Sequence, residues 1–138
     1  MNTLTPTNPA PAAATTAVQR VTDALAALGH AHTPVMLDDA ARTAQEAADA
    51  LGVALGQIAK SIIFRRKGDD RSVLVVTSGD RRVDEKKVQA LVCPEGTRLG
   101  RADADFVKAR TGFSIGGVSP LAHAEPPVVL IDRELFRF

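Results

Sequence analysis

The sequence predicts a mixed α/β (α+β) fold, in which helices pack around one central mixed β-sheet. Segments with the apolar spacing of helices alternate along the chain with runs rich in Val, Ile and Phe, which are typical of strands. Two of these runs flank a short turn and predict a β-hairpin. The chain of 138 residues is 45% hydrophobic and 24% charged, as expected for one globular domain with its own core.

The N-terminal segment differs in composition from the rest of the chain. Residues 1–16 are rich in Pro, Ala and Thr and almost uncharged, which predicts a disordered leader before a domain over residues 17–138. The domain begins with a predicted helix over residues 17–29, because apolar residues recur at spacings of three and four from Val18 to Leu28.

A strand and a second helix are predicted next. The stretch HAHTPVML, residues 30–37, predicts a strand that Pro34 restricts to a sheet edge. TAQEAADALG, residues 43–52, predicts a helix, because Thr43 and Glu46 stand at capping-box spacing and a glycine follows the last apolar residue.

The predicted hairpin lies in IAKSIIFRRKGDDRSVLVVTSG, residues 58–79, with its turn around Gly68–Asp70. Its second arm, Val73–Val76, has no polar break, so we expect this strand in the middle of the sheet.

Two helices, a loop and a strand complete the predicted order. DEKKVQALV, residues 84–92, predicts a helix capped by Asp84, and DADFVKARTG, residues 103–112, predicts another. FSIGGVSPL, residues 113–121, predicts a glycine-rich loop, and PPVVLID, residues 126–132, the final strand.

Charge is unevenly distributed, although the net charge is only +1. Residues 60–110 contain 13 Lys and Arg against 8 Asp and Glu, whereas the segments on either side are net acidic. If the protein binds a polyanion, this middle third would attract it, and the alternative is a solvated basic surface that serves solubility. The absence of Trp and Tyr, with five Phe, disfavours a protein that reads single-stranded RNA by stacking bases on aromatic rings.

Several classes of protein and site are disfavoured by the sequence. No apolar run approaches the ~18 residues that span a bilayer, so we expect no membrane contact. The single cysteine, Cys93, excludes an internal disulfide and fits a cytoplasmic protein. His30, His32 and His123 lack metal-ligand spacing, and no GxSxG, Walker or GxGxxG motif is present, so neither a metal nor a cofactor is expected.

Lys60 interrupts an apolar row in QIAKSIIF. Alternation along a strand gives Lys60 the same face as Ile58, Ile62 and Phe64. Two interpretations are open at this point. The ammonium group extends to water at a sheet edge, or it binds a phosphate or a carbonyl oxygen at a pocket wall.

The second candidate feature is TGFSIGGVSP, residues 111–120. Gly116 and Gly117 permit positive φ and close approach of a ligand to backbone N–H groups, which would form a cradle for an anion or oxyanion. The alternative is a plain turn between a helix and the last strand.

Five stretches together resemble a known family. TAQEAADALG, QIAKSIIF, DRRVD, ADADFVKARTGFSIGGVSPLAH and VVLIDREL occur in the order and at the spacings of the YbaK/EbsC family, which is related to the editing domain inserted in bacterial prolyl-tRNA synthetases. The resemblance covers residues 17–138. Its distinctive marks are a lysine followed by Ser or Thr, here Lys60–Ser61, and a G-x-x-x-P loop, here Gly116–Pro120. It implies a YbaK-like fold with a partly barrel-like sheet.

The resemblance also implies an activity. Members of the family are similar in being freestanding aminoacyl-tRNA deacylases, which hydrolyse the ester of mischarged tRNA. The expected substrate is proline tRNA carrying a small residue such as Ala or Cys, and a prolyl-tRNA synthetase is a second candidate partner. Oligomeric state is left open.

Roles for individual residues follow from the resemblance. The critical lysine of the family maps onto Lys60, which is expected to hold the terminal phosphate or adenosine and to fix the ester. The amides of Gly116 and Gly117 would face the ester carbonyl as charge develops on its oxygen. Ser61 and Ser119 would hold water or the substrate ammonium group.

Two points stay open in this interpretation. His123 is either a structural residue or part of the pocket wall. Family members continue past IDREL with another strand and a Gly-containing segment before a final helix, whereas this sequence stops at Phe138, so a shortened C-terminal end is expected. A non-catalytic module that binds tRNA or a synthetase is therefore the alternative to a deacylase.

Overall fold

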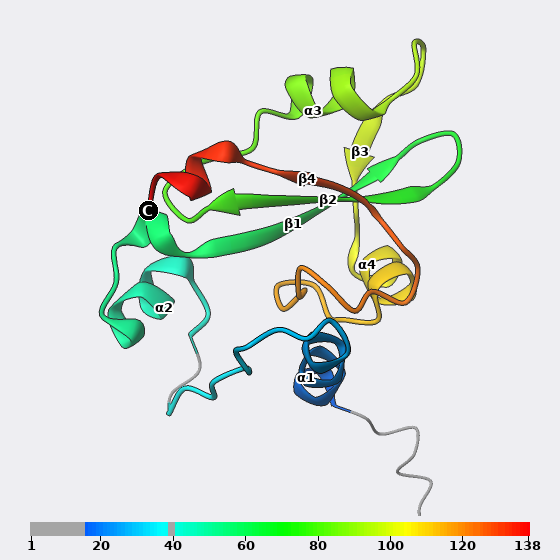
Figure 1. Cartoon of the computed structure of the whole chain (residues 1–138). Helices are drawn as coiled ribbons and strands as arrows, with labels where there is room; N and C mark the ends of the chain where they lie inside the picture. Colours follow the sequence, from blue (N-terminus) through cyan, green and yellow to red (C-terminus); the bar gives the residue numbers. More distant parts are fainter. Residues whose placement is uncertain (1–15, 39–40) are drawn as a thin grey trace, which may run out of the picture. The chain divides into compact units, whose positions relative to one another are not determined.

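A computed structural model describes residues 16–38 and 41–138 of the chain (Figure 1). The chain divides into two compact units, Met1–Met36 and Leu37–Phe138. The predicted leader lies outside the described residues except for Thr16, and the prediction of disorder there stays a prediction.

The first unit contains the predicted N-terminal helix, α1 (Ala17–Ala27). The Thr16 side chain caps it by accepting a hydrogen bond from the Gln19 N–H at 3.0 Å. The strand predicted over residues 30–37 is wrong, because the structure has irregular chain there. A strand is stable only beside another strand, and the described residues of this unit contain none.

The second unit is built on a four-stranded sheet with the order β3-β1-β2-β4. The strands are β1 (Ala59–Arg66), β2 (Arg71–Ser78), β3 (Leu99–Arg101) and β4 (Val128–Ile131). β1 pairs antiparallel with both β2 and β3, whereas β2 and β4 are parallel. The predicted hairpin and mixed sheet are therefore confirmed. The sheet is open, with β3 and β4 at its edges, and does not close into a barrel.

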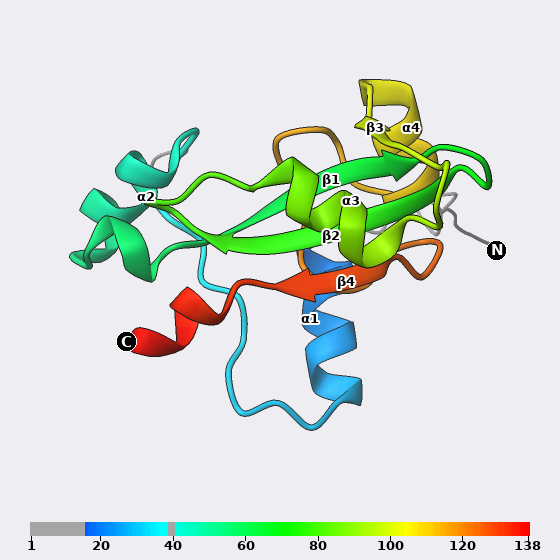
Figure 2. The same ribbon diagram turned by 90° about the horizontal axis from the view of Figure 1, so that it is seen from above.

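Three helices accompany the sheet, and each begins at a side-chain cap. They are α2 (Ala44–Leu51), α3 (Glu85–Val92) and α4 (Ala104–Thr111). Their caps are Thr43, Asp84 and Asp103, whose side chains accept backbone N–H bonds at 2.8 to 3.2 Å. In Figure 1, α3 lies on one side of the sheet and α4 on the other, and Figure 2 shows α3 crossing above the strands.

Burial identifies β2 as the central strand, as the sequence predicts. Its residues 72–78 are all buried, and Leu74 is completely inaccessible. Alternate side chains point to opposite faces. Phe64 and Val75 therefore pack with Val88 of α3 on one face. Val107 of α4 is buried as well.

Two short 3₁₀ helices meet at one end of the hairpin. They are η2 (Leu55–Gln57) and η3 (Arg133–Arg137). The Arg137 guanidinium donates to the Asp80 carboxylate at 2.7 Å, and the buried Ser78 hydroxyl donates to the Gly56 carbonyl at 2.6 Å. Gly56 is buried beneath this contact. A Cβ added there would lie 2.8 Å from both the Asp80 carboxylate and the Phe138 ring.

Candidate functional site

Lys60 lines a cavity of about 390 Å³, and Glu85 at the start of α3 also lines it. On β1, Lys60 lies opposite Thr77 of β2 and shares a face with Ile62 and Phe64. Phe64 is buried in the core and Ile62 packs against it, whereas Lys60 is partly exposed. The same face of β1 therefore contacts the core at Phe64 and Ile62 and lines the cavity at Lys60. We call this cavity the Lys60 cavity.

Two arginines that sequence reasoning missed line the same cavity. Arg82 comes from the turn between β2 and α3, and Arg101 ends the edge strand β3. One acidic side chain, Glu85, also lines it. Within the described ranges, Lys60, Arg82 and Arg101 form no ion pair. The Lys60 cavity is therefore cationic and suited to an anionic ligand.

Asp80 holds the segment between β2 and α3, which carries Arg82, in a defined conformation. Hydrogen bonding from Ser78, with further bonding from Arg137, holds the pKa of Asp80 below its usual value. Asp80 therefore stays ionised near neutral pH and keeps its contact with Arg137. The Arg81 N–H also donates to the Ser78 carbonyl at 3.0 Å. These contacts define the backbone just before Arg82.

The glycine loop follows α4 and uses its two central glycines differently. Gly116 has φ 86°, in the left-handed region that favours glycine, whereas Gly117 does not have a positive φ. The Gly117 N–H donates to the Ser114 carbonyl at 2.9 Å. The Gly117 amide is therefore engaged within the loop, and both glycines are solvent-exposed.

Ser119 and His123 hold the second half of this loop together. His123 Nε2 lies 2.7 Å from the Ser119 carbonyl. A carbonyl only accepts, so this nitrogen carries the proton and donates. The Ser119 hydroxyl accepts from the Leu121 N–H at 3.2 Å. The His123 ring also meets Phe113 edge-on, with centroids 6.0 Å apart. Both side chains have structural partners in this conformation.

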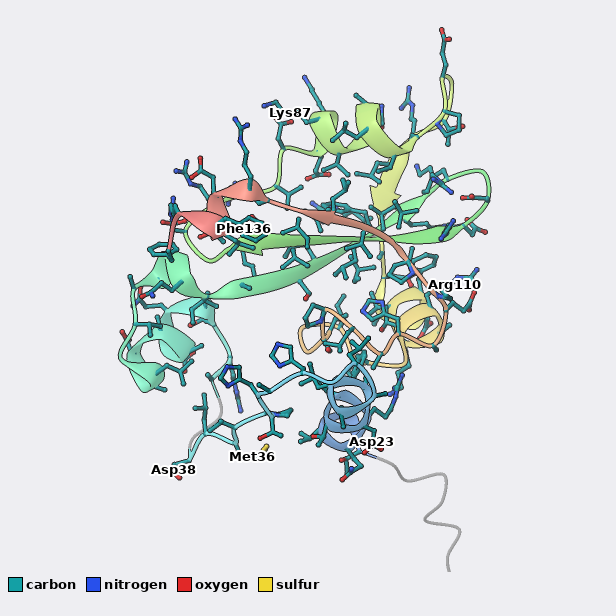
Figure 3. All side chains as sticks on the ribbon, viewed as in Figure 1. Asp23, Met36, Asp38, Lys87, Arg110 and Phe136 are labelled. Carbon is teal, nitrogen blue, oxygen red and sulfur yellow. The ribbon has the colours of Figure 1, made fainter. Side chains whose placement is uncertain are left out.

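The candidate residues fall into two groups. No residue of Gly116–Pro120 is among those that line the Lys60 cavity. Alternation on β1 directs Ser61 to the face opposite Lys60, and Figure 1 shows the loop on the α4 side of the sheet. Figure 3 shows Lys87 of α3 and Arg110 of α4 on opposite sides of the sheet. The structure groups Lys60 with Arg82 and Arg101 rather than with the glycine loop.

Across residues 16–38 and 41–138, no group of three or more His, Cys, Asp or Glu side chains could hold a metal ion. The helices in this part of the chain are each too short or too polar to cross a bilayer.

Residues 38–138 match the family model of the aminoacyl-tRNA editing domain. An uncharacterised Bacillus subtilis protein, YwhH, is 38% identical over 96 residues, which are 70% of this chain and 59% of that protein. A proline–tRNA ligase from Thermoanaerobacter is 28% identical over 94 residues, covering 68% of this chain and 16% of the ligase. The matched region thus spans 59% of the length of YwhH and 16% of the length of the ligase, less than two thirds of either.

A solved structure gives the same result for the fold. It belongs to a protein proposed to be a trans-editing enzyme for prolyl tRNA synthetase. The two superpose with a TM-score of 0.79 at 38% sequence identity, over 88% of this chain and 74% of the other. The family match, the curated relatives and this superposition agree, and the chain belongs to the aminoacyl-tRNA editing domain family.

Proposed function

We propose that this chain is a trans-editing deacylase that hydrolyses the ester of mischarged tRNA in the cytoplasm. The substrate class is proline tRNA carrying a small amino acid such as Ala or Cys, and a prolyl-tRNA synthetase is a candidate partner. One observation supports the proposal most strongly. In a chain of the editing family, Lys60 lies on an otherwise apolar strand face and lines a cavity that Arg82 and Arg101 also line.

The three cations would hold the anionic 3′ end of the tRNA. Hydrogen bonds between charged groups and phosphate contribute about 1.5–3 kcal/mol each. Arg82 and Arg101 come from different elements, so together with Lys60 they can approach a phosphate from more than one side. Glu85, the carboxylate of the cavity, would pair with the α-ammonium group of the amino acid. The ester is thereby fixed between a cationic and an anionic contact.

Hydrolysis then requires positioning more than a strong nucleophile, because an aminoacyl ester is already activated. A water oxygen attacks the ester carbonyl carbon and gives a proton to the neighbouring ribose hydroxyl, which orients the water and passes its own proton to the ribose oxygen of the ester. The bond between the carbonyl carbon and that ribose oxygen breaks, which releases the free amino acid and leaves both ribose hydroxyls protonated. Lys60 contributes by fixing the ester and by offering positive charge to the developing oxyanion.

Selection among amino acids would be steric. The apolar part of the wall includes Ile62, Val83 and Ala102. A cavity that admits a small side chain but excludes proline acts as the second sieve of editing.

A second function is favoured by one specific observation. The glycine loop does not line the Lys60 cavity, so the amide contacts expected from Gly116 to the ester are not assembled there. A non-catalytic module that binds tRNA or a synthetase would need only the cationic cavity.

The test is a panel of mischarged tRNAs, with loss of the aminoacyl ester followed over time. Wild-type protein is expected to release Ala or Cys from proline tRNA. Lys60→Gln is expected to slow release by about 10²-fold, because the ester loses its positioning contact. Lys86→Gln is the matched control, since Lys86 is an exposed residue of α3 outside the cavity.

The outcomes separate the two functions. Turnover that survives Lys60→Gln would remove this lysine from the mechanism. RNA binding without release of any amino acid across the panel would favour the non-catalytic module.

The role of the glycine loop has its own test. Ala at position 116 requires a positive φ, whereas a Cβ at Gly117 would lie 3.7 Å from the Ser114 carbonyl, an ordinary contact. We expect Gly116→Ala to lose about 1 kcal/mol of stability and Gly117→Ala to be nearly neutral. A loss of turnover in Gly116→Ala beyond the fraction unfolded would support a role at the ester. Turnover that follows only the folded fraction would make the loop structural.

A further inference from the structure

Two turns lie at the hairpin end of the sheet (Figure 1), and residues of both line a second cationic cavity. One is the β1–β2 turn and the other precedes β3. The cavity has a volume of about 280 Å³ and is lined by Lys67, Gly68, Gly96, Thr97 and Arg98. Its lining includes two cations and a hydroxyl but no carboxylate, which suits an anion. We call it the hairpin cleft.

Backbone geometry sets the shape of the hairpin cleft. The Lys67 N–H donates to the Arg98 carbonyl at 2.9 Å, which joins the two turns. Gly68 and Gly96 have φ values of 108° and 84°, in the region where side chains are strained. The two turns are therefore held in place without help from a ligand.

The Lys67 side chain is held along the sheet edge. A Cβ built on Gly100 of β3 would lie 2.7 Å from Lys67 Cε and 3.5 Å from Cγ. The methylene stem of Lys67 thus lies across β3 in the space that this glycine leaves open. A side chain already placed in this way loses less entropy when its ammonium group binds a ligand.

The two aspartates of the β1–β2 turn are already paired. Asp69 contacts Arg66 at 2.7 Å and Asp70 contacts Arg65 at 2.6 Å. Glu95 precedes Gly96 in the chain but does not line the cleft. In the part of the chain that the structure describes, the two cleft cations form no ion pair. Their charge is therefore not neutralised from within the protein.

We propose that the hairpin cleft binds a backbone phosphate of the same tRNA whose 3′ end enters the Lys60 cavity, an inference that rests on the proposed function. Arg98 directly precedes β3, and Arg101, which lines the Lys60 cavity, ends it. Residues three positions apart on a strand are separated by about 10 Å. One RNA strand that follows this sheet edge would reach both sites.

The test measures RNA binding without ester chemistry. A fluorescent, non-aminoacylated acceptor-stem RNA ending in CCA is titrated with protein at several salt concentrations. Each phosphate contact adds about 0.7–0.9 to the slope of log K against log salt. The double variant Lys67→Gln/Arg98→Gln is expected to bind more weakly and to reduce this slope by about 1.5. Lys87→Gln/Lys108→Gln, which removes the same charge from α3 and α4, should change the slope much less.

A charge-neutral variant tests the same site by geometry. Gly100→Ala keeps every cation but places a Cβ where the Lys67 stem lies. Gly100 does not have a positive φ, so alanine fits its backbone. We expect the salt slope to fall by about 0.7–0.9, the value for one lost phosphate contact.

The hairpin cleft and the deacylase activity can each fail without the other. An unchanged slope in Lys67→Gln/Arg98→Gln, or no RNA binding by wild-type protein at low salt, would refute the hairpin cleft. RNA binding that depends on the cleft, combined with no ester hydrolysis, would refute the deacylase and leave the cleft standing.

Discussion

Two sets of cations in the second unit have opposite surroundings. The paired cations, each within 3.1 Å of a carboxylate, are Arg65, Arg66, Arg110 and Arg137. The open cations, which line the Lys60 cavity and the hairpin cleft without an ion pair in the described ranges, are Lys60, Lys67, Arg82, Arg98 and Arg101. The net charge of the middle third counts all basic residues alike, so it does not distinguish the paired cations from the open cations. Paired cations hold turns in place, and open cations can bind a polyanion.

The largest expected effect comes from removing open cations beside Lys60. Arg82→Gln/Arg101→Gln should lower kcat/KM for a mischarged tRNA by about 10²-fold or more, since each lost charged hydrogen bond costs about 1.5–3 kcal/mol. The melting temperature should change little, because neither side chain has an ion-pair partner among the described residues. Steady-state deacylation and thermal unfolding check both statements. An equal loss of stability and turnover would break the comparison.

A paired cation should show the reverse pattern. Arg66 donates to the Val92 carbonyl at the end of α3 at 2.8 Å and to the Asp69 carboxylate at 2.7 Å. Arg66→Gln is expected to cost about 1 kcal/mol of unfolding free energy, or about 4–8 °C in melting temperature. Turnover per folded molecule should be unchanged. A selective loss of turnover at constant stability would place Arg66 with the open cations.

The smallest effect is a dependence of stability on pH. A side-chain hydrogen bond from Arg66 lowers the pKa of Asp69 from 3.8 to about 2. A carboxyl group whose pKa is depressed by folding stabilises the protein above its unfolded pKa of about 4, and this contribution is lost as the pH falls toward 2. Asp69→Asn should therefore lose less stability than wild type between pH 5 and pH 2.

Chemical denaturation at each pH measures this difference. Asp105→Asn, a change at an exposed residue of α4, is the control for charge alone. Parallel wild-type and Asp69→Asn curves would show that the Arg66–Asp69 contact does not persist in solution.

Features with local causes were predictable from the sequence. Thr43 and Asp84 cap their helices through atoms three residues away, so spacing alone reveals them. The hairpin follows from two apolar runs around a glycine turn. Lys60 could be found because it interrupts an apolar strand face.

Features that depend on distant partners were missed. β3 has three residues and is held by pairing with β1 and by the Gln89 side chain, which accepts from the Leu99 N–H at 2.9 Å. Arg101 reaches the Lys60 cavity only through this strand. At residues 30–37, by contrast, the sequence predicts a strand that the structure does not contain. The composition suits a strand, but among the described residues no neighbouring strand is present there to pair with it.

Gly56 has a consequence for the segment that follows β4. Because Gly56 has no side chain, the Phe138 ring and the Arg137–Asp80 contact occupy the space that a Cβ would fill. Even a methyl group there is expected to release residues 133–138 while leaving the strands paired. Limited proteolysis of Gly56→Ala would then cleave this segment early, at a temperature where the hairpin is still protected from hydrogen exchange.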